Sequence, residues 1–185
     1  MPDHSLVERL RGGDQTALRE LITQHWQALV AVAMVTTRSE DLAIEAVQDA
    51  FIRLWEIRTT LDPARSAKGL LWTLTRYRAL NVMRGERVHT RLAQRLAQTI
   101  GGQAPVSYNT GAQAIELAEF DAYVVGVIQG LPPRCREVFL MNRKLHMSYA
   151  EIAETLGMSV LTARNQMSLA LQRIARAMID WRKSI

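Results

Sequence analysis

Cysteine is almost missing from this sequence, which has 185 residues and one cysteine, Cys135. A single cysteine excludes an intramolecular disulfide. Arg134 and Arg136 flank Cys135 and would lower a thiol pKa, but we interpret Cys135 as a small residue of a helix core. The histidines have no spacing that would gather a metal ion, so we expect no metal and no cofactor. They are His4, His25, His89 and His146.

Long hydrophobic runs are missing as well. The longest, Ala28 to Val35, is far shorter than the roughly 20 apolar residues that cross a bilayer as a helix. The first residues, MPDHSLVERLRGGD, lack the apolar segment of a secretory signal peptide. We therefore expect a cytoplasmic protein with no direct membrane insertion.

Lysine is scarce, since 20 of the 23 basic residues are arginine, whose planar fork suits bidentate contact with phosphate or base edges. The formal net charge is +5, but it is unevenly distributed. Residues 1–60 carry −3, residues 61–95 carry +6, residues 96–133 carry −3 and residues 134–185 carry +5. Two basic regions separated by an acidic spacer predict two contacts with one polyanion.

The strongly patterned segments all have helical periodicity, and no alternating run predicts a strand. We expect helices over Ser5 to Leu10, from about Asp14, over about Ser39 to Ile57, and over about Ala67 to Arg84, the last with Tyr77 on its buried face. The stretch GGQAPVSYNTGA, residues 101–112, has the composition of a linker. The predicted fold is all-α, with a first bundle over residues 1–95, a flexible linker over 96–114 and a second bundle over 115–185.

A helix-turn-helix is predicted between residues 148 and 174. Ser148 and Glu151 have the spacing of a capping box, Gly157 supplies a turn, and Ser159 caps a second helix. An ordinary helical hairpin is the alternative, but the agreement of caps, turn, apolar stripe and basic surroundings favours DNA binding. The face directed away from the apolar stripe carries Leu161, Thr162, Asn165, Ser168, Gln172 and Arg176, with Arg164 at its flank.

An acidic stripe lies on the expected helix over residues 39–57. Its carboxylates alternate with two aliphatic side chains, Ile44 and Ile52, which a merely solvated face does not explain. A protein interface with an apolar centre and a charged rim explains both, whereas catalysis would need buried carboxylates with shifted pKa values. The stripe consists of Asp41, Ile44, Glu45, Gln48, Asp49 and Ile52.

The order of these segments resembles the extracytoplasmic-function group of bacterial sigma factors, in the sigma-70 family. The resemblance rests on GDQTALRELI, EDLAIEAVQDAFIRLW, the turn DPARS before a basic helix, and LPPRCREVFLMNRKLHMSYAEIAETLGMSVLTAR, and it covers almost the whole chain. It implies that residues 1–95 are region two and residues 115–185 are region four. The implied partners are core RNA polymerase, through its beta-prime clamp and beta flap, promoter DNA and an anti-sigma factor.

The resemblance also implies roles for individual residues, none of them catalytic. The acidic stripe would meet the clamp. Tyr77, Asn81, Gln166 and Leu169 depart from the family's usual residues, so we do not expect its usual minus-thirty-five sequence. The implied minus-ten residues are Arg58, Arg65, Lys68, Arg76, Asn81 and Arg84, and those for the minus-thirty-five element are Thr162, Arg164, Asn165 and Gln166, with Ser168 and Gln172 on the same face.

Other functional classes remain as alternatives. A stand-alone helix-turn-helix regulator would dimerise on a palindromic site and would not need the acidic stripe. A sigma mimic that binds only protein would need a regulatory domain. An enzyme would need a nucleophile, a metal cluster or a glycine-rich phosphate loop, and the sequence offers none of these motifs.

Overall fold

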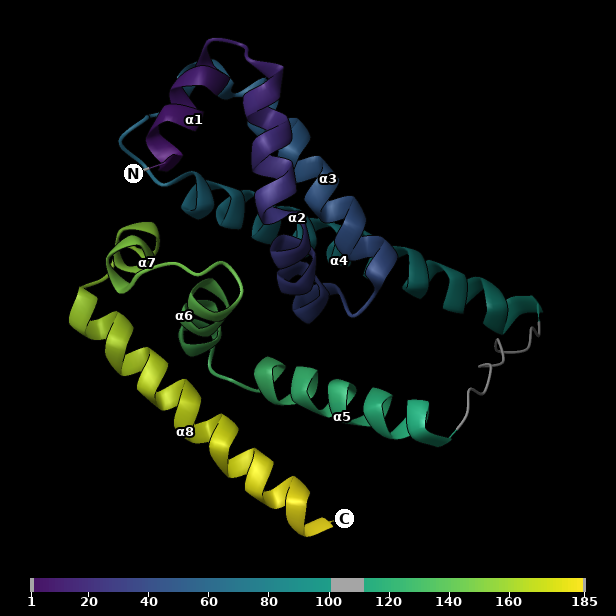
Figure 1. Cartoon of the computed structure of the whole chain (residues 1–185). Helices are drawn as coiled ribbons and strands as arrows, with labels where there is room; N and C mark the ends of the chain where they lie inside the picture. Colours follow the sequence, from purple (N-terminus) through teal and green to yellow (C-terminus); the bar gives the residue numbers. More distant parts are fainter. Residues whose placement is uncertain (1, 101–111, 185) are drawn as a thin grey trace.

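The computed structural model describes the backbone of residues 2–100 and 112–184 and the side chains of residues 5–85, 119, 120 and 122–183. Within these residues every regular element is helical, which confirms the predicted all-α fold (Figure 1). No helix in this part of the chain is long and apolar enough to cross a membrane. The elements are α1 (Pro2–Arg11), α2 (Gln15–Thr37), α3 (Glu40–Glu56), the 3-10 helix η1 (Arg58–Thr60), α4 (Ala67–Ile100), α5 (Ala112–Gln129), α6 (Pro133–Arg143), α7 (Tyr149–Leu156) and α8 (Val160–Ser184).

Helices α1 to α4 form the first bundle. Asp14 caps α2 by accepting a hydrogen bond from the Thr16 backbone N–H, and Arg38, in the left-handed region with φ of 57°, ends it. Ser39 then caps α3, so two adjacent residues turn the chain back on itself. The helices pack over fully buried aliphatic side chains that include Leu10, Leu21, Leu29, Leu54 and Leu71.

Helix α4 differs from its predicted form in length and in orientation. It was expected to end near Arg84 but continues to Ile100, past the expected domain boundary at residue 95. The prediction that Tyr77 is buried was wrong, because its side chain is 60% exposed. The buried face follows Leu71, Thr75 and Ala79, and a threonine at its centre hid this face from the apolar pattern.

Helices α5 to α8 form the second bundle, which contains the helix-turn-helix. Ser148 and Glu151 form both hydrogen bonds of the capping box at the start of α7. Gly157 ends α7 with a positive φ of 61°, which glycine adopts without strain. Cys135 is fully buried, and this burial raises the pKa of its thiol, as expected for a core residue.

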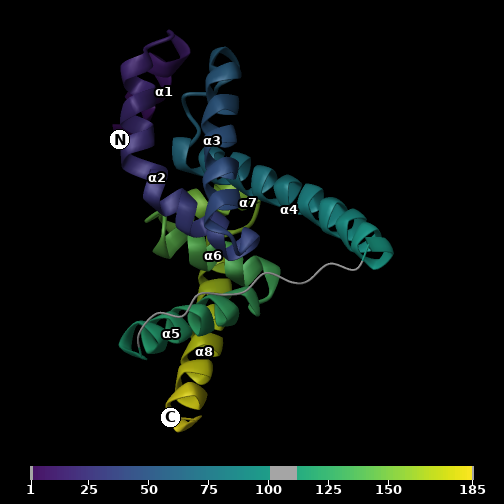
Figure 2. The same ribbon diagram turned by 90° about the vertical axis from the view of Figure 1, so that its right-hand side faces the viewer.

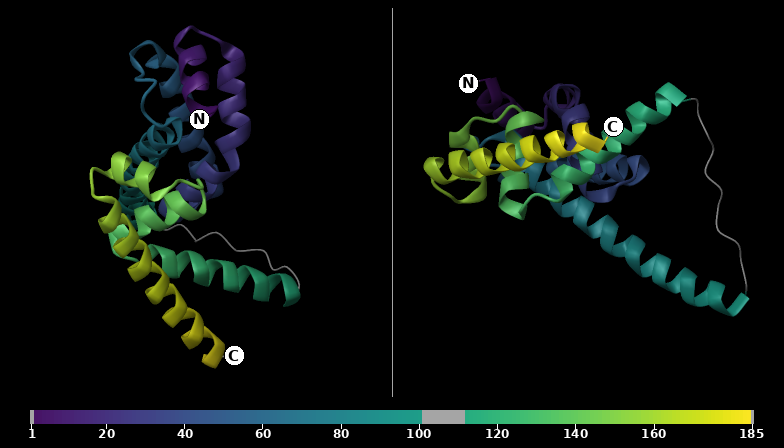
Figure 3. Two further views of the ribbon diagram at one scale, coloured as in Figure 1. Left: turned by 60° about the vertical axis from the view of Figure 1, so that its left-hand side comes forward. Right: turned by 90° about the horizontal axis from the view of Figure 1, so that it is seen from below.

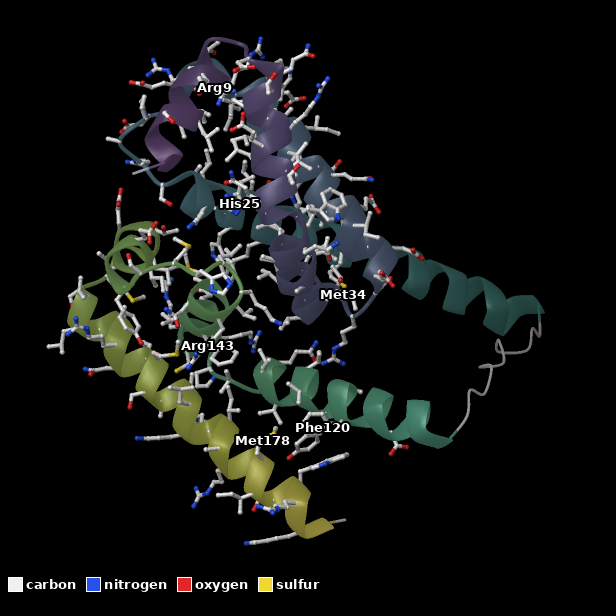
Figure 4. All side chains as sticks on the ribbon, viewed as in Figure 1. Arg9, His25, Met34, Phe120, Arg143 and Met178 are labelled. Carbon is white, nitrogen blue, oxygen red and sulfur yellow. The ribbon has the colours of Figure 1, made fainter. Side chains whose placement is uncertain are left out.

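The last turns of α8 lie beside α5. Phe120 of α5 and Met178 of α8 lie on the facing sides of the two helices (Figure 4). The Tyr123 and Trp181 rings have centroids 4.3 Å apart, and the Tyr123 hydroxyl donates a hydrogen bond of 2.7 Å to the Ala177 carbonyl oxygen. Figure 3 shows α8 as one continuous helix. Its contacts with α5 lie near its C-terminal end, well beyond the helix-turn-helix.

Removing the cap of α7 should destabilise the second bundle. We expect Ser148→Ala to lower the free energy of unfolding by about 1 kcal/mol, because the Glu151 backbone N–H loses its hydrogen bond to the Ser148 hydroxyl. For a chain of this size the midpoint of thermal unfolding should fall by about 2–4 °C. Circular dichroism melts would measure this, with Ser168→Ala on the exposed face of α8 as the matched control. Equal melting of the two variants would contradict the assigned cap.

Candidate protein and nucleic-acid interfaces

The acidic stripe lies on the outer side of α3, directed away from the core of the first bundle. Within the bundle, the Oδ2 atom of Asp49 lies 3.7 Å from Nη1 of Arg78 in α4. Ile52 is 58% exposed, which is unusual for an isoleucine in a packed bundle. Asp41, Glu45, Gln48 and Ile52 are exposed, and Ile44 and Asp49 are half-buried.

An apolar groove adjoins this stripe, and the sequence did not predict it. Trp26 of α2 stacks on Phe51 of α3 with ring centroids 6.3 Å apart. The side chains of Leu18 and Ile22 on α2 are only partly buried. The stripe therefore continues into an apolar surface, a composition typical of the centre of a protein interface. The groove is lined by Leu18, Ile22, Trp26, Gln48, Phe51, Ile52 and Trp55.

The turn between α3 and α4, together with the first turn of α4, holds three of the predicted minus-ten residues. The Arg58 guanidinium lies 4.4 Å from the centre of the Trp55 ring and donates a hydrogen bond of 2.9 Å to the Trp55 carbonyl oxygen. Arg65 is exposed and stands 3.8 Å from Asp62 across the turn. Lys68 is half-buried in the first turn of α4. Arg58 is thus fixed against an aromatic ring, whereas Arg65 faces solvent.

The three remaining minus-ten residues lie along α4. Asn81 accepts a hydrogen bond of 3.4 Å from Arg84, so these two side chains act together. The exposed ring of Tyr77 lies one helical turn before Asn81, on the same side of α4. Arg76 is different, because its guanidinium contacts Glu137 of the second bundle at 2.8 Å. The structure brings Asn81 and Arg84 together and separates Arg76 from them.

The predicted minus-thirty-five residues lie on α8, and five of the six are exposed. Ser159 caps this helix by accepting a hydrogen bond of 3.0 Å from the Thr162 backbone N–H. The Arg164 guanidinium lies 5.9 Å from the centre of the Tyr149 ring. Gln166 is half-buried, and its Oε1 accepts a hydrogen bond of 2.9 Å from the Cys135 thiol. The exposed residues are Thr162, Arg164, Asn165, Ser168 and Gln172.

Two family profiles match this chain, one in each bundle. The profile described as Sigma-70 region 2 matches residues 21–88, which include α3 and the first half of α4. The profile described as Sigma-70, region 4 matches residues 122–174, which include the helix-turn-helix. The two matches have the order expected from the sequence.

Curated relatives are similar over almost the whole chain. The RNA polymerase sigma factor CnrH of Cupriavidus metallidurans is 27% identical over 96% of this chain and 94% of its own length. The probable RNA polymerase sigma factor RfaY of Xanthomonas campestris is 23% identical over 96% of this chain. This chain spans only 44% of the length of RfaY.

Solved structures share the fold. A structure of CnrH in complex with the cytosolic domain of CnrY has a TM-score of 0.69 at 23% identity and covers 96% of this chain and 97% of that one. The sigma factor RpoE from Bartonella quintana, in complex with the anti-sigma factor NepR, has a TM-score of 0.59 at 20% identity and covers 86% of this chain and 94% of that one. Both similarities extend over helices of the two bundles.

Proposed function

This chain belongs to the extracytoplasmic-function group of the sigma-70 family, and from this premise we propose that it is an alternative sigma factor that gives core RNA polymerase its promoter choice. The observation that carries the proposal is the pairing of two regions in one chain. An exposed face that is both acidic and apolar lies in the first bundle, and a capped helix-turn-helix lies in the second. A stand-alone regulator would need only the second of these.

We assign polymerase binding to the acidic stripe and its adjoining groove. The carboxylates would meet basic side chains of the beta-prime clamp, and this complementarity fixes orientation and speeds association. Ile52 and the groove beside it would supply the buried apolar area of the contact. The second bundle would contact the beta flap. The proposed domains are residues 1–95, a linker over 96–114 and residues 115–185.

We assign minus-ten recognition to the turn before α4 and to the exposed side of α4. Arg65 and Arg84 are cations placed to attract backbone phosphates. An unpaired base held by the turn between Arg58 and Lys68 would shift the duplex toward its open state, because the base is captured outside the stack. The step forms no covalent bond, so the proposed role is that of an initiation factor and needs no catalytic residue.

We assign minus-thirty-five recognition to the exposed face of α8. The first turn of this helix would enter the major groove, where Thr162 and Asn165 can meet base edges and Arg164 can bind phosphate. Gln166 contributes less than the sequence suggested, because its carbonyl oxygen already bonds to Cys135. The Gln166–Cys135 hydrogen bond leaves α8 with one fewer side chain to meet DNA, and Leu169 stands where the family usually has arginine. Both features support a promoter preference different from the family's usual one.

We further propose that an anti-sigma factor holds the chain inactive. RpoE, whose fold is similar, is described in complex with the anti-sigma factor NepR. Such a partner would cover the polymerase-binding face until a signal releases it. The site of action would be the cytoplasm, where the polymerase and the chromosome are found.

The test is reconstitution with purified core RNA polymerase. The chain should co-purify with core enzyme, and the reconstituted enzyme should start new run-off transcripts on fragments of the source genome at sites that share upstream elements. Core enzyme alone is the control. Retention of DNA binding without any binding to core would instead support the stand-alone helix-turn-helix regulator.

A further inference from the structure

A cavity of about 450 Å³ lies where α2, α4 and α6 meet (Figure 2). Much of its wall is apolar, and Val35, Trp72 and Leu140 are apolar lining residues from these three helices. Gln129 of α5 also lines the cavity and donates a hydrogen bond of 2.6 Å to the Val35 carbonyl oxygen. Proteins bind small molecules in concave, mostly apolar sites of about 300–1,000 Å³. The cavity therefore has the size and the lining of a site for a small organic molecule.

The charged groups of the cavity wall are mostly cationic. Arg38, Arg76 and Arg136 line it, whereas Glu137 is the only acidic residue among its described lining residues. The Glu137 carboxylate is already paired, since one oxygen lies 2.8 Å from the Arg76 guanidinium and the other lies 3.0 Å from that of Arg134. It therefore repels an approaching anion less than a free carboxylate would. The remaining positive charge of the wall attracts a negatively charged ligand.

Arg136 and Arg38 differ in what they offer to a ligand. The Arg136 Nε atom donates a hydrogen bond of 3.2 Å to the Ile128 carbonyl oxygen, and its Nη2 atom donates to the carbonyl oxygens of Gln129 and Leu131. These bonds hold Arg136 against the C-terminal end of α5. Arg38 is exposed, and its side chain forms no hydrogen bond or ion pair within the part of the chain that the structure describes. Its guanidinium therefore keeps all of its N–H donors available to an anion.

The Thr75 hydroxyl is a second sign that this wall faces a polar molecule. Thr75 lines the cavity and is fully buried, and its hydroxyl has no hydrogen-bond partner among the described residues. Thr73, two residues earlier in α4, makes the usual bond of a helical threonine, at 2.9 Å to the Gly69 carbonyl oxygen. Buried hydroxyls are rarely left unpaired, because nothing then replaces the hydrogen bonds that they made to water. A polar atom of a bound molecule would satisfy Thr75.

We propose that this cavity is a binding site for a small organic anion with an apolar body. The anionic group, a carboxylate or a phosphate, bonds to Arg38 at the mouth of the cavity. The apolar body packs against the walls that α2 and α4 contribute. This inference does not depend on the proposed function, so the site is tested on the free full-length chain without polymerase or DNA.

Isothermal titration calorimetry with naphthylacetate and naphthyl phosphate is the first test, since both probes join a two-ring apolar body to an anionic group. At least one of them should bind, and the tighter of the two identifies the preferred anion. The uncharged match, naphthylacetamide, should bind about ten-fold more weakly, because it lacks the charge-assisted hydrogen bond. Failure of both anions to bind would remove the site, and equal binding of the amide would refute its preference for anions.

Arg38→Asn should weaken binding of the preferred anion about ten-fold while the chain stays folded, which circular dichroism would verify. Arg38 ends α2 with a φ of 57°, and asparagine adopts this left-handed region more readily than most residues. Arg11→Asn removes the same charge from an exposed position of α1 and should leave the affinity unchanged. Equal weakening by the two variants would mean that only net charge attracts the probe, which contradicts a site at Arg38.

NMR of the chain with isotope-labelled methionine methyl groups locates the bound probe. Met83 lines the cavity, so its methyl signal should shift during the titration with the dissociation constant found by calorimetry. Met178 lies on α8 and is not a lining residue of the cavity, so its signal should stay unchanged (Figure 4). A probe that bound without shifting the Met83 signal would occupy another surface, and the proposed site would be wrong.

Discussion

Glu45→Arg is expected to weaken binding of the chain to core RNA polymerase by about 100-fold. Glu45 is exposed near the middle of the acidic stripe, and reversing its charge replaces attraction to a basic partner with repulsion. A like-charge contact across an interface costs several kcal/mol, and about 3 kcal/mol corresponds to a factor of 100 in affinity. Titration of labelled protein with core enzyme, monitored by fluorescence anisotropy, would measure the dissociation constant.

Glu45 is a cleaner probe than Asp49. Asp49 lies beside Arg78 of α4, so an arginine at position 49 would also repel a neighbour within the bundle. Glu8→Arg on the exposed side of α1 makes the same charge change away from the stripe and should leave core affinity unchanged. If Glu45→Arg bound as tightly as Glu8→Arg, α3 would not be the clamp-binding helix. Wild-type affinity should also fall as salt is raised, since screening weakens contacts between exposed charges.

The helix-turn-helix was predictable because its signals are local. Ser148, Glu151, Gly157 and Ser159 each determine the backbone within four residues of themselves, and the structure has the capping box, turn and second cap where the sequence placed them. The two-bundle, all-α fold was predictable for a similar reason, since helical periodicity is a short-range pattern.

Exposure within α4 was not predictable from the same pattern. Thr75 is polar in sequence yet fully buried, and it lies at the centre of the face that contacts the other helices. A stripe drawn through the apolar residues alone was rotated toward Tyr77, which the structure exposes. Periodicity identifies a helix more reliably than it identifies which side of the helix packs.

The surroundings of two predicted site residues were also beyond the sequence. Gln166 bonds to Cys135, which is 31 residues earlier in the chain, and Arg76 bonds to Glu137 in the other bundle. Both contacts depend on how helices pack, and no local motif indicates either. Glu137 itself gave no signal, since an isolated glutamate in a helix is ordinarily a solvated residue.

Asn165→Ala is expected to lower transcription from the chain's own promoters by about 10-fold to 100-fold while leaving core affinity unchanged. Asn165 is exposed on the first turns of α8, and an asparagine that bonds to a base edge contributes roughly 1–3 kcal/mol of discrimination. Run-off transcription on a library of templates with a randomised minus-thirty-five element would measure both the loss and the base pair at which preference relaxes.

Gln166→Ala is the matched control for that result, because the two residues are adjacent in sequence and differ in orientation. The Gln166 carbonyl oxygen accepts a hydrogen bond from Cys135, so its loss should cost a little stability and leave base preference unchanged. If Gln166→Ala and Asn165→Ala relaxed the base preference equally, the Gln166 side chain would have to leave Cys135 when DNA binds. If only Asn165→Ala relaxed the base preference, α8 would meet DNA in the orientation it has in the free chain. The packing of Cys135 against α8 would then fix which side chains of this helix can read the promoter.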